Sequence, residues 1–119
     1  MLGLRTTVYK VVDLKSAKNW YTKTFRVTPY FEENYYVGFN IGGYELGLLR
    51  EVNAKSRSDH QISYWGVDNI QESFDHLLSC GASVHEAPND VGGDISVASV
   101  YDPWDNIIGI IYNPHFKVS

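Results

Sequence analysis

Cysteine is almost absent from this chain. Cys80 is its single cysteine, which excludes an intramolecular disulfide and any metal site built from paired cysteines. It stands in "LLSCGA", an apolar helix end, where a cysteine is more often a packed small side chain than a nucleophile. We therefore expect no chemistry from this residue.

Long hydrophobic runs and a leader pattern are also missing. No stretch reaches the roughly 18 consecutive apolar residues of a membrane-spanning helix. The opening "MLGLRTTVYK" lacks the apolar core and small-residue cleavage site of a signal peptide. These absences predict a cytoplasmic protein without a membrane partner.

Positive charge is in short supply as well. Lys and Arg total 10 against 14 Asp and Glu, giving a net charge of −4, so nucleic acid is not an expected partner. A hydrophobic content of 44% and a charged content of 20% are ordinary for a globular chain, and the length suits one domain. Aromatic residues are plentiful, with nine Tyr, five Phe and three Trp, which favours strands and packed cores.

The hydrophobic pattern predicts the same order of elements twice. Each half reads as a strand, an amphipathic helix and three further strands. The expected elements are 4–12, 14–25, 30–31, 35–41 and 44–49, then 61–67, 70–80, 82–88, 95–102 and 107–113. We therefore predict an α+β fold of two tandem β-α-β-β-β modules, with a curved mixed sheet around a cleft and the helices on the outer face. The single domain 1–119 would comprise module one (1–50), a polar linker (51–59) and module two (60–119).

A repeated glycine marks the last strand of each module. "GYELGLL" and "DNIIGII" place Gly47 and Gly109 at the same point of the two repeats. Glycine within a strand costs stability because it has no side chain to pack and loses the most backbone entropy. We expect these glycines to clear the floor of the cleft and to leave a volume there for a ligand.

Five stretches that span nearly the whole chain resemble the vicinal oxygen chelate superfamily, the group of glyoxalases, bleomycin-resistance proteins and extradiol dioxygenases. They are "VYKVVDLKSAKNWY", "YYVGFNIGGYELGL", "YWGVDNI", "LLSCGASVHEAPNDVGG" and "VASVYDPWDNIIGIIYNPHF". Within the last, "DPWDNIIG" is similar to the family's DPxGN hairpin, with Asp105 in place of glycine. Aspartate tolerates left-handed turn conformations, so the hairpin should form. The resemblance implies a homodimer.

The resemblance also implies where a metal would bind. Metal-dependent members take one ligand from the first strand of each module, usually His, and one from the last strand, usually Glu. The matching positions here are Thr6, Gly47, Ile62 and Gly109. These residues offer at most a weak hydroxyl ligand, and a shift of alignment by two residues brings in only His60 or Glu45. We therefore expect no metal of the usual kind and no cofactor.

Strand alternation predicts the residues of the cleft. Only one of Tyr35 and Tyr36 can point inward, and Tyr36 is the residue assigned. The predicted ligand-binding residues are Thr6, Val8, Lys10, Tyr36, Glu45, Gly47, Ile62, Tyr64, Gly109 and Ile111. This mainly apolar surface with scattered polar groups is typical of a small-molecule pocket.

Glu45 is the candidate catalytic residue. Its carboxyl could act as a general base or bind a ligand cation, with a pKa raised by burial. As a structural residue it could pair with Lys10 or Arg50, or lie at the solvated rim of the cleft. Two functions stay open. The favoured one is binding of a small apolar or aromatic molecule in a metal-free cleft, as in bleomycin-resistance proteins. The alternative is a glyoxalase-like lyase or isomerase, or a dioxygenase-related enzyme, acting on a small carbonyl or aromatic metabolite through Glu45, Lys10 and Tyr64.

Overall fold

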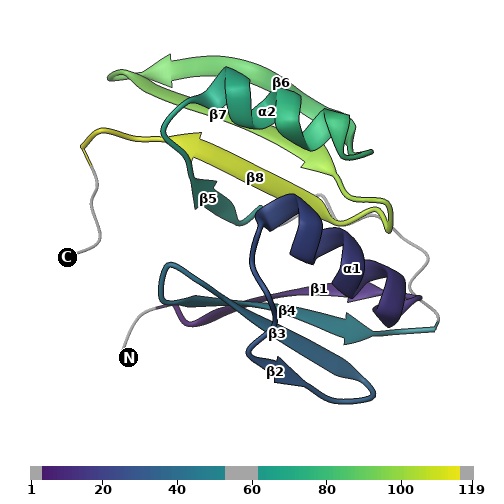
Figure 1. The fold of residues 1–119 in the computed structure, drawn as a ribbon. Coiled ribbons are helices and arrows are strands. Elements are labelled where there is room, and N and C mark those ends of the chain that lie inside the picture. Colours follow the sequence, from purple (N-terminus) through teal and green to yellow (C-terminus); the bar gives the residue numbers. More distant parts are fainter. Residues whose placement is uncertain (1–3, 53–61, 116–119) are drawn as a thin grey trace. The chain divides into compact units, whose positions relative to one another are not determined.

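The structure, a computed structural model, describes residues 4–52 and 62–115. The chain forms two compact units, 1–55 and 56–119, and each is described by itself. Each unit contains one helix and four strands in the order β-α-β-β-β (Figure 1). The predicted α+β fold of two tandem modules is therefore confirmed. Most of the predicted linker lies outside the described residues.

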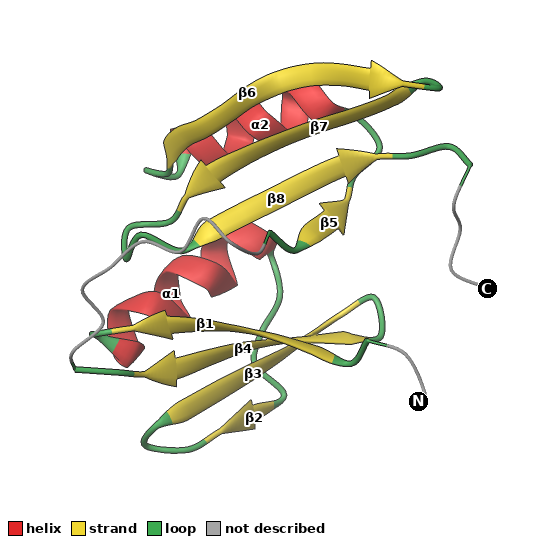
Figure 2. Ribbon diagram, turned by 180° about the vertical axis from the view of Figure 1, so that it is seen from behind, coloured by secondary structure: helices red, strands yellow, loops and turns green. Residues whose placement is uncertain are grey.

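The first unit is a mixed four-stranded sheet with a helix on one face. Its strands lie in the order β1-β4-β3-β2, with β1 parallel to β4 and the other neighbours antiparallel (Figure 2). Parallel pairing of β1 and β4 requires a crossover, and α1 is part of that connection. The bounds are β1 (Thr6–Val11), α1 (Leu14–Phe25), β2 (Phe31–Glu32), β3 (Tyr36–Ile41) and β4 (Tyr44–Arg50).

The helix-facing side of this sheet is the core of the unit. Helix α1 begins after Asp13, whose carboxylate accepts a hydrogen bond of 3.1 Å from the Ser16 amide. The Tyr21 ring is fully buried and contacts the rings of Tyr9 and Phe39 at centroid distances of 6.0 and 6.5 Å. Alternate strand residues complete this core, namely Tyr9, Val11, Val37, Phe39, Leu46 and Leu48.

The second unit repeats this topology. Its strands lie in the order β5-β8-β7-β6, with β5 parallel to β8. Asn69 caps α2 by accepting a hydrogen bond of 3.0 Å from the Glu72 amide, and the helix packs on β6, β7 and β8. The bounds are β5 (Tyr64–Gly66), α2 (Ile70–Ser79), β6 (Ser83–Gly92), β7 (Ile95–Tyr101) and β8 (Ile107–Tyr112). Neither described helix has the length and apolar character needed to cross a membrane.

Strand β6 differs from the prediction. The segment 89–94 was expected to be a loop, but β6 continues to Gly92 and pairs with β7 through three register shifts. Gly92, Gly93 and Asp94 all have positive φ and form the tight turn into β7. The strand pairing thus extends through polar residues that carry no alternating apolar signal, because backbone hydrogen bonds to β7 are sufficient.

The turn before β8 takes the conformation expected from its sequence. Asp105 has a φ of 67°, in the left-handed region. Asp102 holds the turn together, since one carboxylate oxygen accepts from the Trp104 and Asn106 amides at 2.9 and 2.8 Å. Its other oxygen accepts from the Asn106 side chain at 3.0 Å. The prediction that an aspartate can replace the family's glycine here is confirmed.

Candidate ligand-binding site

The open face of the first sheet, opposite α1, carries the predicted first-unit residues. Strand β1 contributes Thr6, Val8 and Lys10, all exposed. Strand β4 contributes Glu45 and Gly47, and pairing places Thr6 opposite Glu45 and Val8 opposite Gly47. Thr6 and Gly47, the two positions of this module that match the family's metal ligands, lie on neighbouring strands but are not direct partners in the register.

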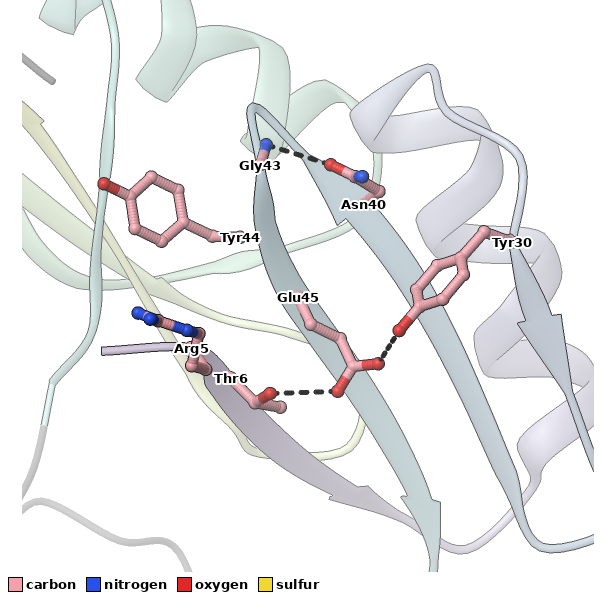
Figure 3. Close-up of a pocket in the computed structure, with 7 residues that line it drawn as sticks. All are labelled: Arg5, Thr6, Tyr30, Asn40, Gly43, Tyr44 and Glu45. Carbon is pink, nitrogen blue, oxygen red and sulfur yellow. Dashed lines mark hydrogen bonds between the residues drawn. The ribbon is translucent and has the colours of Figure 1, made fainter. Parts of the chain in front are cut away.

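The centre of this face is the carboxylate of Glu45, which accepts hydrogen bonds from three hydroxyl groups. Figure 3 shows the bonds from Thr6 and Tyr30. The Thr6 hydroxyl donates to Oε1 at 3.0 Å, and the Tyr36 hydroxyl donates to the same oxygen at 2.7 Å. The Tyr30 hydroxyl donates to Oε2. The structure thus joins Thr6, Tyr36 and Glu45 from the predicted set and adds Tyr30.

These hydrogen bonds set the ionisation of the cluster. They lower the pKa of Glu45, with the Tyr30 bond as the largest cause and the Tyr36 bond next, against a smaller opposing effect of burial. Conversely, burial and then the Glu45 bond raise the pKa of Tyr36, and the Glu45 bond raises the pKa of Tyr30. At neutral pH the cluster is therefore one carboxylate and two neutral phenols.

The expected role of Glu45 needs two corrections. Its pKa was predicted to rise through burial, but three donors outweigh the partial burial and lower it. A structural pairing with Lys10 or Arg50 was the other expectation. The partners are hydroxyl groups instead, because the register brings Thr6 beside Glu45 while the two tyrosines reach it from β3 and from the segment before β2.

The expectation that the strand glycines leave room for a ligand is wrong. A Cβ atom on Gly47 would collide with the Tyr36 hydroxyl and ring, so Tyr36 already occupies that space. In the second unit a Cβ atom on Gly109 would lie 2.7 Å from atoms of Ile62, Ser63 and Tyr64. Both glycines permit close packing of neighbours rather than a cavity.

A pocket of about 320 Å³ lies beside the cluster, at the end of the sheet where β3 turns into β4. Asn40 shapes this turn by accepting a hydrogen bond of 2.9 Å from the Gly43 amide (Figure 3). The residues that line the pocket are Arg5, Thr6, Tyr30, Asn40, Gly43, Tyr44 and Glu45.

Sequence reasoning missed five of the pocket residues, namely Arg5, Tyr30, Asn40, Gly43 and Tyr44. Tyr30 precedes β2, and its side chain crosses Gly38 to reach Glu45; a Cβ atom on Gly38 would lie 3.2 Å from the Tyr30 ring. The available signal was the glycine at 38, which pairs directly with Gly47. Two glycines facing each other on neighbouring strands indicate that larger side chains from elsewhere lie across them.

The second unit carries the other predicted site residues on its own sheet. Tyr64 lies opposite Gly109 and Gly66 opposite Ile111, so these positions are equivalent to those of the first unit. Ser99, also opposite Gly109, is buried and its hydroxyl lies 2.7 Å from His85 Nδ1. None of the predicted site residues on this sheet has a carboxylate, so they form no counterpart of the Glu45 cluster. These residues are Ile62, Tyr64, Gly109 and Ile111.

Residues 3–110 match the model of the Glyoxalase/Bleomycin resistance protein/Dioxygenase superfamily. The chain belongs to this superfamily. No curated protein sequence matches it. The match spans most of both units, in agreement with the resemblance inferred from the sequence.

Solved structures of this superfamily share the fold. A glyoxalase-related enzyme from Fulvimarina pelagi is 16% identical, with a TM-score of 0.81, over 100% of this chain and 94% of its own. Lactoylglutathione lyase from Agrobacterium tumefaciens is 16% identical, with a TM-score of 0.77, over 98% and 99%. A bleomycin resistance determinant encoded on the transposon Tn5 is 16% identical, with a TM-score of 0.75, over 94% and 98%. At these identities the likeness shows the fold alone.

Some superfamily members hold a metal ion, but the matching positions of this chain carry no suitable ligands. The four positions carry a threonine, an isoleucine and two glycines, and the space over each glycine is filled by neighbouring atoms. Within residues 4–52 and 62–115, no group of three or more His, Cys, Asp and Glu side chains is placed to hold a metal ion. The side chains in these ranges do not fit a metal of this kind.

Proposed function

We propose that this superfamily member is a small-molecule-binding protein of the bleomycin-resistance kind, and that its ligand contacts the pocket beside Glu45. The carrying observation is the carboxylate fixed by three hydroxyl groups at the edge of a pocket of about 320 Å³. This volume lies at the lower end of the range for small-molecule sites. A preorganised acceptor in such a pocket orients a ligand without rearrangement of the protein.

Aromatic side chains beside the carboxylate support a ligand with an aromatic or apolar skeleton. The Tyr30 and Phe31 side chains are 62% and 43% exposed. The Phe31 ring contacts those of Tyr30 and Tyr36 at centroid distances of 6.4 and 6.2 Å. The ring planes are tilted against one another, by 41° and 57°, and offer an apolar aromatic surface beside a charged group.

The alternative of acid–base catalysis by Glu45 is less well supported. A carboxylate that accepts three hydrogen bonds has a lowered pKa and is a weaker base. Tyr36, with its raised pKa, is a weaker acid than a free phenol. The cluster therefore suits the holding of a charge better than the transfer of a proton.

A ligand screen with residue-resolved detection tests the binding proposal. Aromatic metabolites and drugs that bind should raise the melting temperature, because a ligand selective for the folded state stabilises it. Titration followed by amide NMR should then shift signals around Gly43, Tyr44 and Glu45. An absence of stabilising compounds in a broad library would contradict the proposal. Shifts confined to the second unit would contradict the location.

The variant Glu45→Gln separates binding from catalysis once a binder is known. If the protein only binds its ligand, the variant should bind that ligand more weakly. If the protein is a catalyst, the wild type should convert the ligand into a new product and the variant should not. The matched control is Glu33→Gln, which removes the same charge from an exposed residue before β3. Equal effects of the two substitutions would remove Glu45 from the proposed site.

Association and location complete the proposal. Superfamily resemblance supports a homodimer, and the sequence supports a cytoplasmic location. Size-exclusion chromatography with light scattering should give twice the mass of one chain, and a mass of one chain would contradict the dimer. A fluorescent fusion that accumulates outside the cytoplasm would contradict the location.

A further inference from the structure

The unused hydrogen-bonding capacity of Glu45 points to the chemistry of the ligand. A carboxylate offers about four lone-pair sites for hydrogen bonds. Oε1 accepts from Thr6 and Tyr36, whereas Oε2 accepts only from Tyr30. One acceptor site therefore remains on Oε2, the oxygen on the Tyr30 side.

The charge of Glu45 is also left without an opposite charge. All three of its donors are neutral hydroxyl groups. No lysine or arginine is among the groups that shift the pKa of Glu45, and the Lys18–Glu32 ion pair, at 2.9 Å, does not involve it. A fixed carboxylate with a remaining acceptor site and no cationic partner in the described structure favours a donor that brings its own positive charge.

The remaining acceptor site on Oε2 lies apart from Arg5, the cationic residue among those that line the pocket. Figure 3 shows Glu45 between Thr6 and Arg5 on one side and Tyr30 on the other. Arg5 Nη1 donates to the Leu4 carbonyl at 3.4 Å. A cation at Oε2 would therefore lie on the aromatic side of the carboxylate, away from the guanidinium. The ring of Tyr30 on that side attracts cations through its π face, and the Phe31 ring contacts it.

We propose that the ligand of this pocket carries a protonated primary or secondary amine on an aromatic skeleton, and that the amine donates to Oε2 of Glu45. The inference rests on the proposed function and names the class of ligand for the same site. The skeleton packs on the exposed rings of Tyr30 and Phe31. Thr6 and Tyr36 keep their bonds to Oε1 and hold the carboxylate in place.

Matched pairs of amines and alcohols test this inference. A panel led by benzylamine, which is protonated at neutral pH, and benzyl alcohol is titrated into the full chain and followed by amide NMR. We expect each amine to bind about tenfold more tightly than its alcohol, as a charge-assisted hydrogen bond outweighs a neutral one. Benzyltrimethylammonium, which has no N–H group, should bind more weakly than benzylamine.

Variants assign the preference to the carboxylate. Glu45→Gln should abolish the tenfold preference, and the control Glu33→Gln should retain it. Tyr30→Phe keeps the carboxylate and should also retain a preference for the amine. Retention of the preference in Glu45→Gln, or its loss in both other variants, would overturn the inference.

The outcomes distinguish this inference from the proposed function. Equal affinities for amines and alcohols at the pocket would overturn the inference and leave the binding proposal standing. If a broad aromatic library and the matched pairs all fail to shift amides near Glu45, both are overturned. Tight binding of benzyltrimethylammonium would contradict the hydrogen bond to Oε2.

Discussion

Gly38 and Gly47 lie directly opposite each other on β3 and β4. Neither has a side chain, and the space above the pair is taken by Tyr30, Tyr36 and Glu45. A larger residue at either position would displace the groups that hold the carboxylate. The Glu45 cluster can therefore pack in this arrangement only because both positions lack a side chain.

Substitution of Gly47 should test this requirement. In Gly47→Ala the new methyl group meets the Tyr36 hydroxyl and ring, and we expect a loss of about 1–3 kcal/mol in the free energy of unfolding. Urea denaturation measures the change. Gly66→Ala is the control, because a Cβ atom there has no neighbour within 4 Å and the variant should be nearly neutral. Equal stability of the two variants would contradict the packing role of Gly47.

The buried side of the first sheet could be predicted from the sequence, because it depends on local pattern. Alternating apolar residues marked Leu46 and Leu48 for the core, and both are fully buried. The left-handed Asp105 was also predictable, since the preference belongs to that residue and its turn.

The Glu45 cluster depends on contacts between distant segments and could be predicted only in part. Alternation placed Thr6, Tyr36 and Glu45 on one face, but Tyr30 precedes a two-residue strand and has no periodicity to fix its direction. The pKa of Glu45 was predicted with the wrong sign because burial is suggested by the pattern, whereas the three donors arise from tertiary structure. Gly47 was recognised as unusual, but its neighbour Tyr36 could not be placed above it.

The acid stability of the protein should depend on Glu45. Its folded-state pKa lies below the ordinary value of 4.5, so the unfolded chain binds the proton at a higher pH than the folded chain. The stabilisation is fully present above 4.5 and is lost as the pH falls through the folded-state pKa. Urea denaturation from pH 7 to about pH 3 should therefore show a smaller acid-dependent loss in Glu45→Gln than in the wild type.

The control for this experiment is Glu33→Gln, which removes an exposed carboxyl outside the cluster. The free energy of unfolding of this variant should change with pH as that of the wild type does. If Glu45→Gln and the wild type lose stability in parallel, the hydroxyl donors do not stabilise the carboxylate.

The tyrosines of the cluster should resist ionisation at high pH. The pKa of Tyr36 is raised above its ordinary value of 10, chiefly by burial and then by Glu45. The unfolded chain therefore releases this proton first, and the free energy of unfolding should fall as the pH rises above 10. A spectrophotometric titration of wild type and Tyr36→Phe should differ by one late-titrating phenol. If Tyr36→Phe instead removes a phenol that titrates early, the raised pKa assigned to Tyr36 is contradicted. Tyr35→Phe, which changes the neighbouring tyrosine, is the control.

The turn before β8 should depend on one carboxylate and tolerate change at another. Asp102 is 3% exposed and accepts from two backbone amides and one side-chain amide. In Asp102→Asn a donor replaces one acceptor oxygen, and we expect a loss of about 1–3 kcal/mol in the free energy of unfolding. Asp105→Gly is the contrasting variant, because glycine adopts the left-handed conformation without steric cost and should leave stability unchanged or slightly higher. Urea denaturation decides between them. A neutral Asp102→Asn, or an Asp105→Gly that is the more damaging of the two, would show that the turn is held by other contacts.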